Sequence, residues 1–199
     1  YTLAAGVEAE VFATADYRVT TRIDLTGNEF NNSITGSEGI NTLRGGGGAD
    51  TLKGLGGNDV LDGNAGLDYL FGGVGNDIYY VDNVQDSVVE AAGEGIDRVF
   101  SSVSFTLSAN VERLVFTSGS AAVTVTGNAF DNEIFGNENN NVLNGLAGND
   151  KIDGGAGNDT IVGGAGEDVL DGQAGNDNMQ GGDDYDNLEG GDGDDFIDA

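Results

Sequence analysis

Carboxylate and carboxamide side chains recur at a spacing of nine residues in two stretches of the chain. From Gly27 the sequence divides into six successive nonamers covering residues 27–80, and from Gly127 into eight more covering residues 127–198. The sixth position of each nonamer is Asn or Asp: Asn32, Asn41, Asp50, Asp59, Asp68, Asp77, Asn132, Asn141, Asp150, Asp159, Asp168, Asp177, Asp186 and Asp195. Their side-chain oxygens are hard ligands, which suit a hard cation.

The composition excludes most other chemistry. The chain of 199 residues has no His and no Cys, so a Ser-His-Asp triad, the common zinc sites and disulfide bonds are ruled out. Asp and Glu number 35 against 7 Lys and Arg, a formal net charge of −28. The few cations are scattered and cannot form a basic patch, so nucleic acid is not expected as a partner. No segment approaches the ~18 consecutive apolar residues of a membrane span.

Each nonamer is predicted to form a glycine turn followed by a short strand. Position one is always Gly, and Gly is frequent at positions two and four, which suits positive φ and close backbone approach. Position eight is apolar in every nonamer, which predicts one inward side chain per strand. Two nonamers then complete a flattened coil of about 18 residues. Stacking of coils at ~4.8 Å places position six above position six two nonamers away, along two opposite edges.

Stacked carboxylates require positive charge between them. Two carboxylates ~5 Å apart repel by roughly 3 kcal/mol at an effective dielectric constant of about 20. The motif offers Asp oxygens and the carbonyl oxygens of the glycine turns, without nitrogen or sulfur donors. Such a set favours calcium over magnesium, which prefers a tighter octahedron and retains its waters. We therefore expect Ca2+ as the cofactor.

The nonamers GGAGNDTIV (residues 154–162) and GGAGEDVLD (residues 163–171) resemble, position for position, the nonapeptide GGxGxDxUx of the RTX (repeats-in-toxin), haemolysin-type calcium-binding proteins. The resemblance implies an all-β chain folded as a parallel β-roll, a β-solenoid of nine-residue repeats, in two tandem blocks. It also implies that each ion is held between loops n and n+2 by two position-six Asp side chains and by backbone carbonyls.

Carried over residue by residue, the resemblance implies about six calcium ions. The bridging pairs are Asp50 with Asp68, Asp59 with Asp77, Asp150 with Asp168, Asp159 with Asp177, Asp168 with Asp186, and Asp177 with Asp195. Asp168 and Asp177 would each serve two ions, so their loops are expected to be the best formed. The ligating backbone expected in those loops is Gly163, Gly164, Ala165, Gly166, Gly172, Gln173, Ala174 and Gly175.

Among the nonamers with Asp at position six, five side chains depart from the glycine pattern. Leu55, Asn64, Leu146 and Gln173 replace the second Gly, and Asp184 replaces the fourth. A carbonyl oxygen persists under any side chain, whereas a left-handed turn is disfavoured for a residue that carries a Cβ. These positions therefore test whether the turn survives the departures.

Each block opens with two nonamers that have Asn at position six. A neutral Asn pair needs no counter-ion, so we interpret these coils as a cap that forms first and templates the rest. Asn also ligates calcium through its side-chain oxygen. Extra sites at Asn41 with Asp59 and at Asn141 with Asp159 therefore stay open as an alternative.

The chain is predicted to contain two copies of a larger unit. FTLSANVERLVF, from Phe105, matches YTLAAGVEAEVF, from Tyr1, and the stretch between the blocks is rich in Val, Phe and Ser. The predicted domains are an N-terminal β capping segment at 1–26 (a copy of 105–126), a first β-roll block at 27–80, a connecting β segment at 81–126 and a second β-roll block at 127–198.

The resemblance also implies a function. RTX proteins typically leave the bacterial cell unfolded through type I secretion machinery, so we expect a secreted, extracellular, non-enzymatic region of a larger protein that folds on binding calcium. Without calcium the glycine-rich acidic runs are expected to be disordered. An alternative is a polysaccharide-binding or adhesive module, whose mark would be an exposed aromatic or Thr column. The outward positions show no clear column of this kind. An enzyme would need chemistry outside the repeats.

Overall fold

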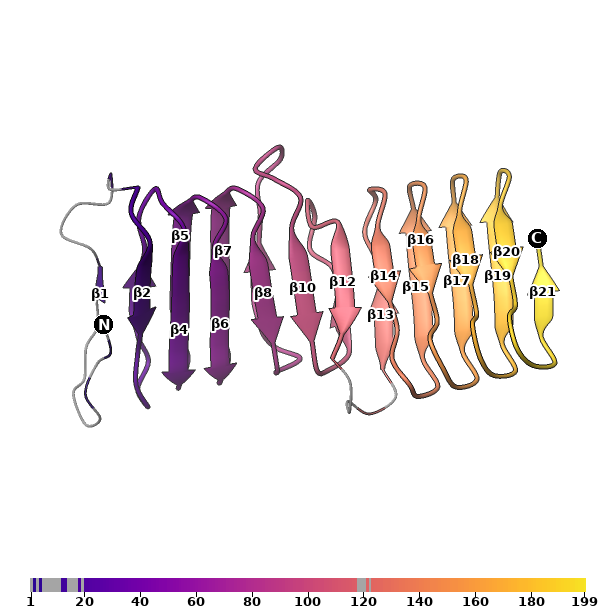
Figure 1. Cartoon of the computed structure of the whole chain (residues 1–199), viewed down its shortest axis with the longest axis horizontal. Helices are drawn as coiled ribbons and strands as arrows, with labels where there is room; N and C mark the ends of the chain where they lie inside the picture. The colour runs from indigo at the N-terminus through magenta and orange to yellow at the C-terminus, as the bar shows by residue number, and fades with distance from the viewer. Residues whose placement is uncertain are drawn as a thin grey trace. The chain divides into compact units, whose positions relative to one another are not determined.

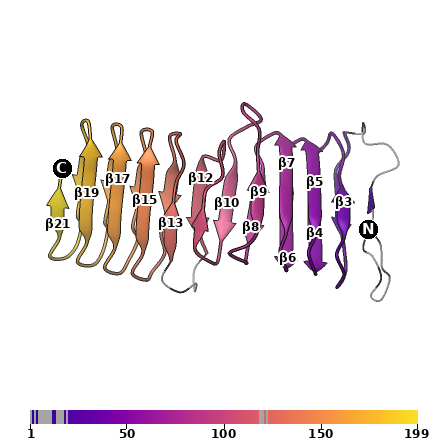
Figure 2. The same cartoon turned by 180° about the vertical axis from the view of Figure 1, so that it is seen from behind.

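The computed structural model describes residues 2, 4, 12–13, 18, 20–117, 121 and 123–199. Regular structure in these residues consists of β-strands, which form a parallel β-solenoid (Figures 1 and 2). The predicted all-β roll of nine-residue repeats is confirmed. The chain divides into two compact units, Tyr1–Phe100 and Ser101–Ala199. No membrane-spanning helix is found in the described part of the chain.

Successive strands of the first unit alternate between two parallel sheets. One has the order β1-β3-β5-β7-β9, and the other begins β2-β4-β6-β8-β10. Partners are therefore two strands apart in sequence, and two strands make one coil. The strands are β1 (Phe12–Ala13), β2 (Ile23–Thr26), β3 (Ser33–Thr35), β4 (Asn41–Gly47), β5 (Thr51–Gly56), β6 (Val60–Ala65), β7 (Tyr69–Val74), β8 (Ile78–Val81), β9 (Ser87–Val89) and β10 (Arg98–Ser101).

The second unit has the same winding. Its sheets contain β11-β13-β15-β17-β19-β21 and β12-β14-β16-β18-β20. The strands are β11 (Phe105–Thr106), β12 (Arg113–Phe116), β13 (Thr124–Thr126), β14 (Glu133–Phe135), β15 (Val142–Ala147), β16 (Lys151–Asp153), β17 (Thr160–Ala165), β18 (Val169–Asp171), β19 (Asn178–Asp183), β20 (Asn187–Glu189) and β21 (Phe196–Asp198).

The strand register superposes equivalent positions of nonamers n and n+2. In the first unit Leu43 pairs with Leu61, and Leu61 pairs in turn with Tyr79. In the second unit Leu143 pairs with Ile161. Each of these residues is the eighth of its nonamer. The predicted coil of two nonamers is therefore present in both units.

The core is built from position-eight side chains that point into the roll. Leu61 in the first unit and Ile161 in the second have 0% of their surface exposed. Burying such a side chain contributes about 1.5–3 kcal/mol, and the flanking polar residues face outward. The row of apolar side chains thus supplies one buried contact per half coil.

The predicted N-terminal capping segment, residues 1–26, lies largely outside the described residues. Within it, β1 pairs with β3 through Phe12 and Ile34, and β2 pairs with β4 through Leu25 and Leu43. The division of the chain into capping, roll and connecting segments remains a prediction.

Candidate metal sites

Position-six residues form columns in both units, each residue lying directly before a strand. The backbone N–H of one residue donates to Oδ1 of the position-six Asp two nonamers later. This bond measures 2.8 Å from Asp50 to Asp68 and 2.7 Å from Asp150 to Asp168. The other pairs are Asp59 with Asp77 (2.7 Å), Asp159 with Asp177 (2.7 Å), Asp168 with Asp186 (2.9 Å) and Asp177 with Asp195 (2.9 Å). Every pair named from the sequence is thus brought together.

The second carboxylate oxygen of the column residues has no hydrogen-bond donor. Oδ2 is buried without a partner in Asp50, Asp59, Asp68, Asp77, Asp150, Asp159, Asp168, Asp177 and Asp186. Leaving one buried acceptor unsatisfied costs about 1–3 kcal/mol, and more when it is charged. The repetition of this environment at one position of the motif indicates a positively charged ligand.

The glycine at position one makes room for these oxygens. A Cβ on Gly45 would overlap both Asp50 Oδ2 and the carbonyl oxygen of Gly63, and a Cβ on Gly163 would overlap Asp168 Oδ2 and the Gly181 carbonyl oxygen. The carboxylate oxygen of one loop and a backbone carbonyl oxygen of the coil two nonamers later therefore lie close to the same point. Two acceptors without a donor between them fit a hard cation such as calcium.

The two reasons for glycine, positive φ and close backbone approach, apply to different positions of the loop. Positive φ occurs at positions two and four, as at Gly46 (113°) and Gly48 (96°), but not at Gly45. Position one requires Gly because there is no space for a Cβ, whereas positions two and four require it for their backbone conformation.

The residues that replace these glycines keep the left-handed turn. Their φ angles are 86° at Leu55, 58° at Asn64, 80° at Leu146, 72° at Gln173 and 79° at Asp184. A non-glycine residue in this region costs of order 1–3 kcal/mol, so neighbouring coils hold these turns in place. The turn survives the departures.

The two loops expected to be best formed share one geometry. Gly163, Gly164 and Ala165 end β17, and Gly166 follows with φ 128°. In the next loop, Gly172 leads into Gln173 and Gly175, both with positive φ, while Ala174 forms parallel bridges with Ala156 and Asp192.

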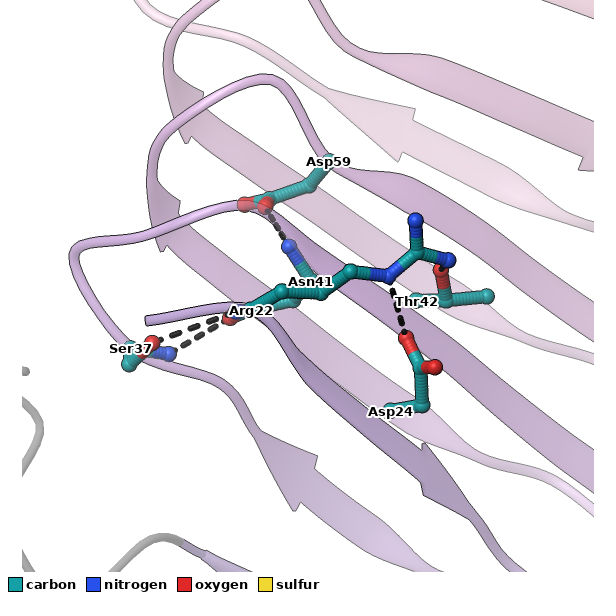
Figure 3. A network of polar contacts seen from close by, with 6 residues as sticks. All are labelled: Arg22, Asp24, Ser37, Asn41, Thr42 and Asp59. Atoms are coloured by element: carbon teal, nitrogen blue, oxygen red, sulfur yellow. Dashed lines mark hydrogen bonds and ion pairs between the residues drawn. The ribbon is translucent and has the colours of Figure 1, made fainter. Parts of the chain in front are cut away.

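Loops with Asn at position six satisfy that side chain internally. Asn41 Oδ1 accepts from the Ser37 N–H at 2.6 Å, and Asn41 Nδ2 donates to Ser37 Oγ at 3.1 Å (Figure 3). The Asn41 N–H still donates to Asp59 Oδ1 at 2.7 Å. Asn141 uses Asn137 in the same way, at 2.8 and 3.0 Å.

Figure 3 also shows an exposed pair at the start of this roll: Arg22 Nε donates to Asp24 at 3.2 Å, and Arg22 Nη2 donates to Thr42 Oγ1 at 3.3 Å.

The closed Asn loops have a signal in the sequence that was missed. It is a polar residue at position two of the nonamer together with Asn at position six.

Burial raises the pKa of the column carboxylates. The pKa of Asp59, Asp68 and Asp77 rises to about 7, and that of Asp50 to about 6. Desolvation of the charged form is the main cause, partly offset by the backbone hydrogen bond to each carboxylate. In the second unit burial likewise raises the pKa of Asp159 to about 7. A bound cation would favour the ionised form that burial disfavours.

The sequence model of the RTX calcium-binding nonapeptide repeat matches this chain in several copies. They lie at residues 26–61, 45–79, 54–88, 124–152, 135–170, 145–179 and 171–199, together well over half of the chain. The chain belongs to the RTX calcium-binding repeat family. A search of curated proteins finds no significant match. The RTX roll is a calcium-binding region and a structural module rather than a catalytic one.

Two acidic residues beyond the nonamers continue the RTX columns. Asp86 Oδ1 accepts from the Asp68 N–H at 3.0 Å, and Asp97 Oδ1 accepts from the Asp77 N–H at 2.8 Å. The first step keeps the 18-residue spacing, but the second spans 20 residues. Residues 81–89 retain Asp at position six and an apolar residue at position eight without any Gly. That partial pattern was the overlooked signal.

A second, exposed series of bonds runs along position five of the RTX repeats. Asn149 Oδ1 accepts from the Glu167 N–H at 2.9 Å, and Asn158 Oδ1 accepts from the Asn176 N–H at 2.8 Å. In the first unit Asn58 Oδ1 accepts from the Asn76 N–H at 3.0 Å. The Asn side chain at this position therefore links coil n to coil n+2.

Proposed function

We propose that this chain is a calcium-dependent folding module of a larger secreted bacterial RTX protein. The observation that carries the proposal is the set of buried Oδ2 atoms without donors, most of which converge with a carbonyl oxygen from the coil two nonamers later, as at Gly45 and Gly163. Calcium supplies the positive charge that these acceptors need. The RTX repeats supply the family context.

About six ions are proposed, one for each Asp pair that was named from the sequence and that the columns bring together. The position-six Asp residues of loops n and n+2 would hold each ion with backbone carbonyls. The Asn loops close on themselves through residues such as Ser37 and Asn137. This closure favours a cap role for the Asn coils over extra ion sites at Asn41 and Asn141.

Because folding would depend on calcium, the chain would be unfolded inside the bacterial cell and folded outside it. With a formal net charge of −28 and paired buried carboxylates, the calcium-free chain repels itself. Extracellular calcium modules bind with dissociation constants of about 10⁻⁴ to 10⁻³ M. The chain would therefore stay unfolded at low internal calcium, pass through type I secretion machinery, and fold outside the cell without catalytic activity of its own.

Circular dichroism during a calcium titration tests this function. At about pH 8, where the column carboxylates are ionised, the chain in chelator is expected to lack the β-strand signal, which then appears cooperatively as calcium rises through the range given above. Magnesium at equal concentration serves as the control and should not substitute. A full β-strand signal in chelator would contradict the proposal.

A polysaccharide-binding module is the second candidate, favoured by an aromatic pair on the outer face of the first unit. Tyr80 on β8 is 42% exposed, and its ring stacks on Phe100 of β10 with centroids 5.4 Å apart. Arg98 lies over the Phe100 ring at 5.9 Å. A glycan array probed in the presence of calcium tests this candidate, and the absence of any bound glycan would remove it.

A further inference from the structure

A third carboxylate joins one of the columns in the last coil of the first unit. Ligand oxygens of Asp77, Glu90 and Asp97 all lie within 4.8 Å of one another. The three residues are buried, with 1%, 8% and 0% of their surfaces exposed. Glu90 and Asp97 lie outside the segments that match the RTX repeat.

Glu90 occupies the place that Gly holds in the regular loops. Gly72 precedes its column residue Asp77 by five positions, whereas Glu90 precedes Asp97 by seven. In a regular loop a Cβ at position one would overlap the position-six carboxylate, as at Gly72 with Asp77 Oδ2. The last loop has a side chain at this place, and that side chain carries a carboxylate.

Tyr79 orients this added carboxylate. It replaces the usual aliphatic residue at position eight, is fully buried, and its hydroxyl donates to Glu90 Oε1. A Cβ on Gly72 would overlap both the Tyr79 hydroxyl and Asp77 Oδ2, so these two atoms reach the same place. A carboxylate has two oxygens, so one can accept from Tyr79 while the other ligates an ion.

Asp77 directs an unsatisfied oxygen into this cluster. Its Oδ1 accepts from the Asp59 N–H at 2.7 Å, which commits that oxygen to the column. Its Oδ2 is buried without a hydrogen-bond donor and lies beside the Tyr79 hydroxyl.

We propose that Asp77, Glu90 and Asp97 form a further divalent cation site of calcium type, built outside the nonapeptide motif. The site rests on the calcium chemistry proposed above but uses ligands that the motif does not contain. Three carboxylates supply one more negative charge than a regular pair, and calcium affinity rises with ligand charge. This site should therefore bind the tightest ion of the first unit.

Calorimetric titration of the whole chain with calcium tests the site through Glu90→Gln. The substitution keeps the shape of the side chain and its acceptor for Tyr79, but removes the charge. We expect the tightest ion to weaken by about tenfold or more while the remaining ions keep their affinities. The matched control is Glu38→Gln, which removes a charge from an exposed side chain of the same unit and should change the tightest affinity by less than about twofold.

A second readout uses Tyr79 as an antenna for terbium, a luminescent substitute for calcium. Tyrosine-excited terbium emission should fall in Glu90→Gln because the ion is lost. It should also fall in Tyr79→Phe because the antenna is lost, and the tightest calcium ion should weaken as well because Glu90 loses the hydroxyl that orients it. Circular dichroism of both variants in calcium should still show the β-strand signal, which separates loss of this ion from a change in folding.

The outcomes distinguish this site from the regular ones. If the wild-type chain binds calcium and Glu90→Gln binds the same number of ions with unchanged affinities, the site is overturned while the proposed function stands. If the wild-type chain binds no calcium, both are overturned. Loss of one tight ion in Glu90→Gln alone supports the site.

Discussion

At the scale of single residues, two oxygens of one Asp side chain have separate roles. Oδ1 of Asp168 accepts from the Asp150 N–H and stacks the coils, whereas Oδ2 is left without a donor. An Asn in the same place could keep the first role but would lose charge from the second. Hydrogen bonding and cation binding can therefore be separated by an Asp-to-Asn substitution.

Asp168→Asn and Asp186→Asn should lose different numbers of ions. Asp168 pairs with both Asp150 and Asp186, while Asp186 pairs with Asp168 in the column described above. We expect Asp168→Asn to weaken two calcium ions and Asp186→Asn to weaken one, each by about tenfold or more, because each ion loses a carboxylate charge. Calorimetry and elemental analysis of calcium measure the stoichiometry. Equal losses in the two variants would contradict shared ligation.

Leu146→Gly should stabilise the calcium-loaded roll. Leu146 holds φ at 80° and is 45% exposed, so Gly relieves backbone strain at a modest cost in buried apolar surface. The expected gain in the free energy of unfolding is about 1 kcal/mol. The neighbouring Ala147 lies outside the positive-φ region, so Ala147→Gly is the matched control and should destabilise by about 0.5–1 kcal/mol. Urea unfolding in saturating calcium measures both, and a loss of stability in Leu146→Gly would refute the strain argument.

At the scale of strands, inward and outward positions should respond differently. Leu170 and Val169 are neighbours on β18, with 1% and 44% of their surfaces exposed. Leu170→Ala is expected to cost about 2–5 kcal/mol because the roll has no second layer of apolar side chains to fill the cavity. Val169→Ala should stay within about 0.5 kcal/mol. Chemical unfolding in saturating calcium compares them, and similar losses would show that the row of position-eight side chains is not the main core.

The strand arrangement could be predicted because a single period of nine residues determines it. Apolar residues at position eight and Asp at position six recur together, so the coil of two nonamers and the Asp pairs followed directly. The extension was missed at Asp86 because residues 81–89 lack the glycines of the motif, and at Asp97 because two inserted residues break the period while the backbone keeps its pairing. Such a change of spacing is invisible to a fixed frame.

The surroundings of each carboxylate were harder to predict from the sequence than its position. Closure of the Asn41 loop by Ser37 depends on a contact across four residues, and the need for Gly at position one depends on the space that Asp50 Oδ2 occupies. Neither is a property of residue type alone. Periodicity therefore located the columns, and only packing distinguished the loops that need an ion from those that do not.

At the scale of the whole molecule, the effect of pH on the stability of the roll should have opposite signs without and with calcium. Burial raises the pKa of Asp59, Asp68, Asp77 and Asp159 to about 7 from an ordinary value of 3.8. Between these values the calcium-free roll binds more protons than the unfolded chain, so its stability falls as pH rises. In chelator the β-strand signal should therefore be larger near pH 5 than near pH 8, at about equal ionic strength.

Calcium reverses this dependence because it binds the ionised carboxylates. As pH falls below about 7, protons compete with the ion, and the calcium concentration at the folding midpoint should rise. Circular dichroism titrations at several pH values measure the midpoint. A midpoint that is independent of pH would show that the buried carboxylates are not the groups that bind calcium.

Within each block of nonamers, the constant offset between paired strands has a consequence for how quickly the chain assembles. Leu43 meets Leu61 and Leu143 meets Ile161 across the same short stretch of sequence. Closing each turn therefore carries the same modest entropic cost however many repeats are joined, and contacts stay local compared with those of most β proteins. The roll should therefore fold by adding one coil at a time to a formed nucleus. Further repeats should leave the rate at which each coil is added unchanged.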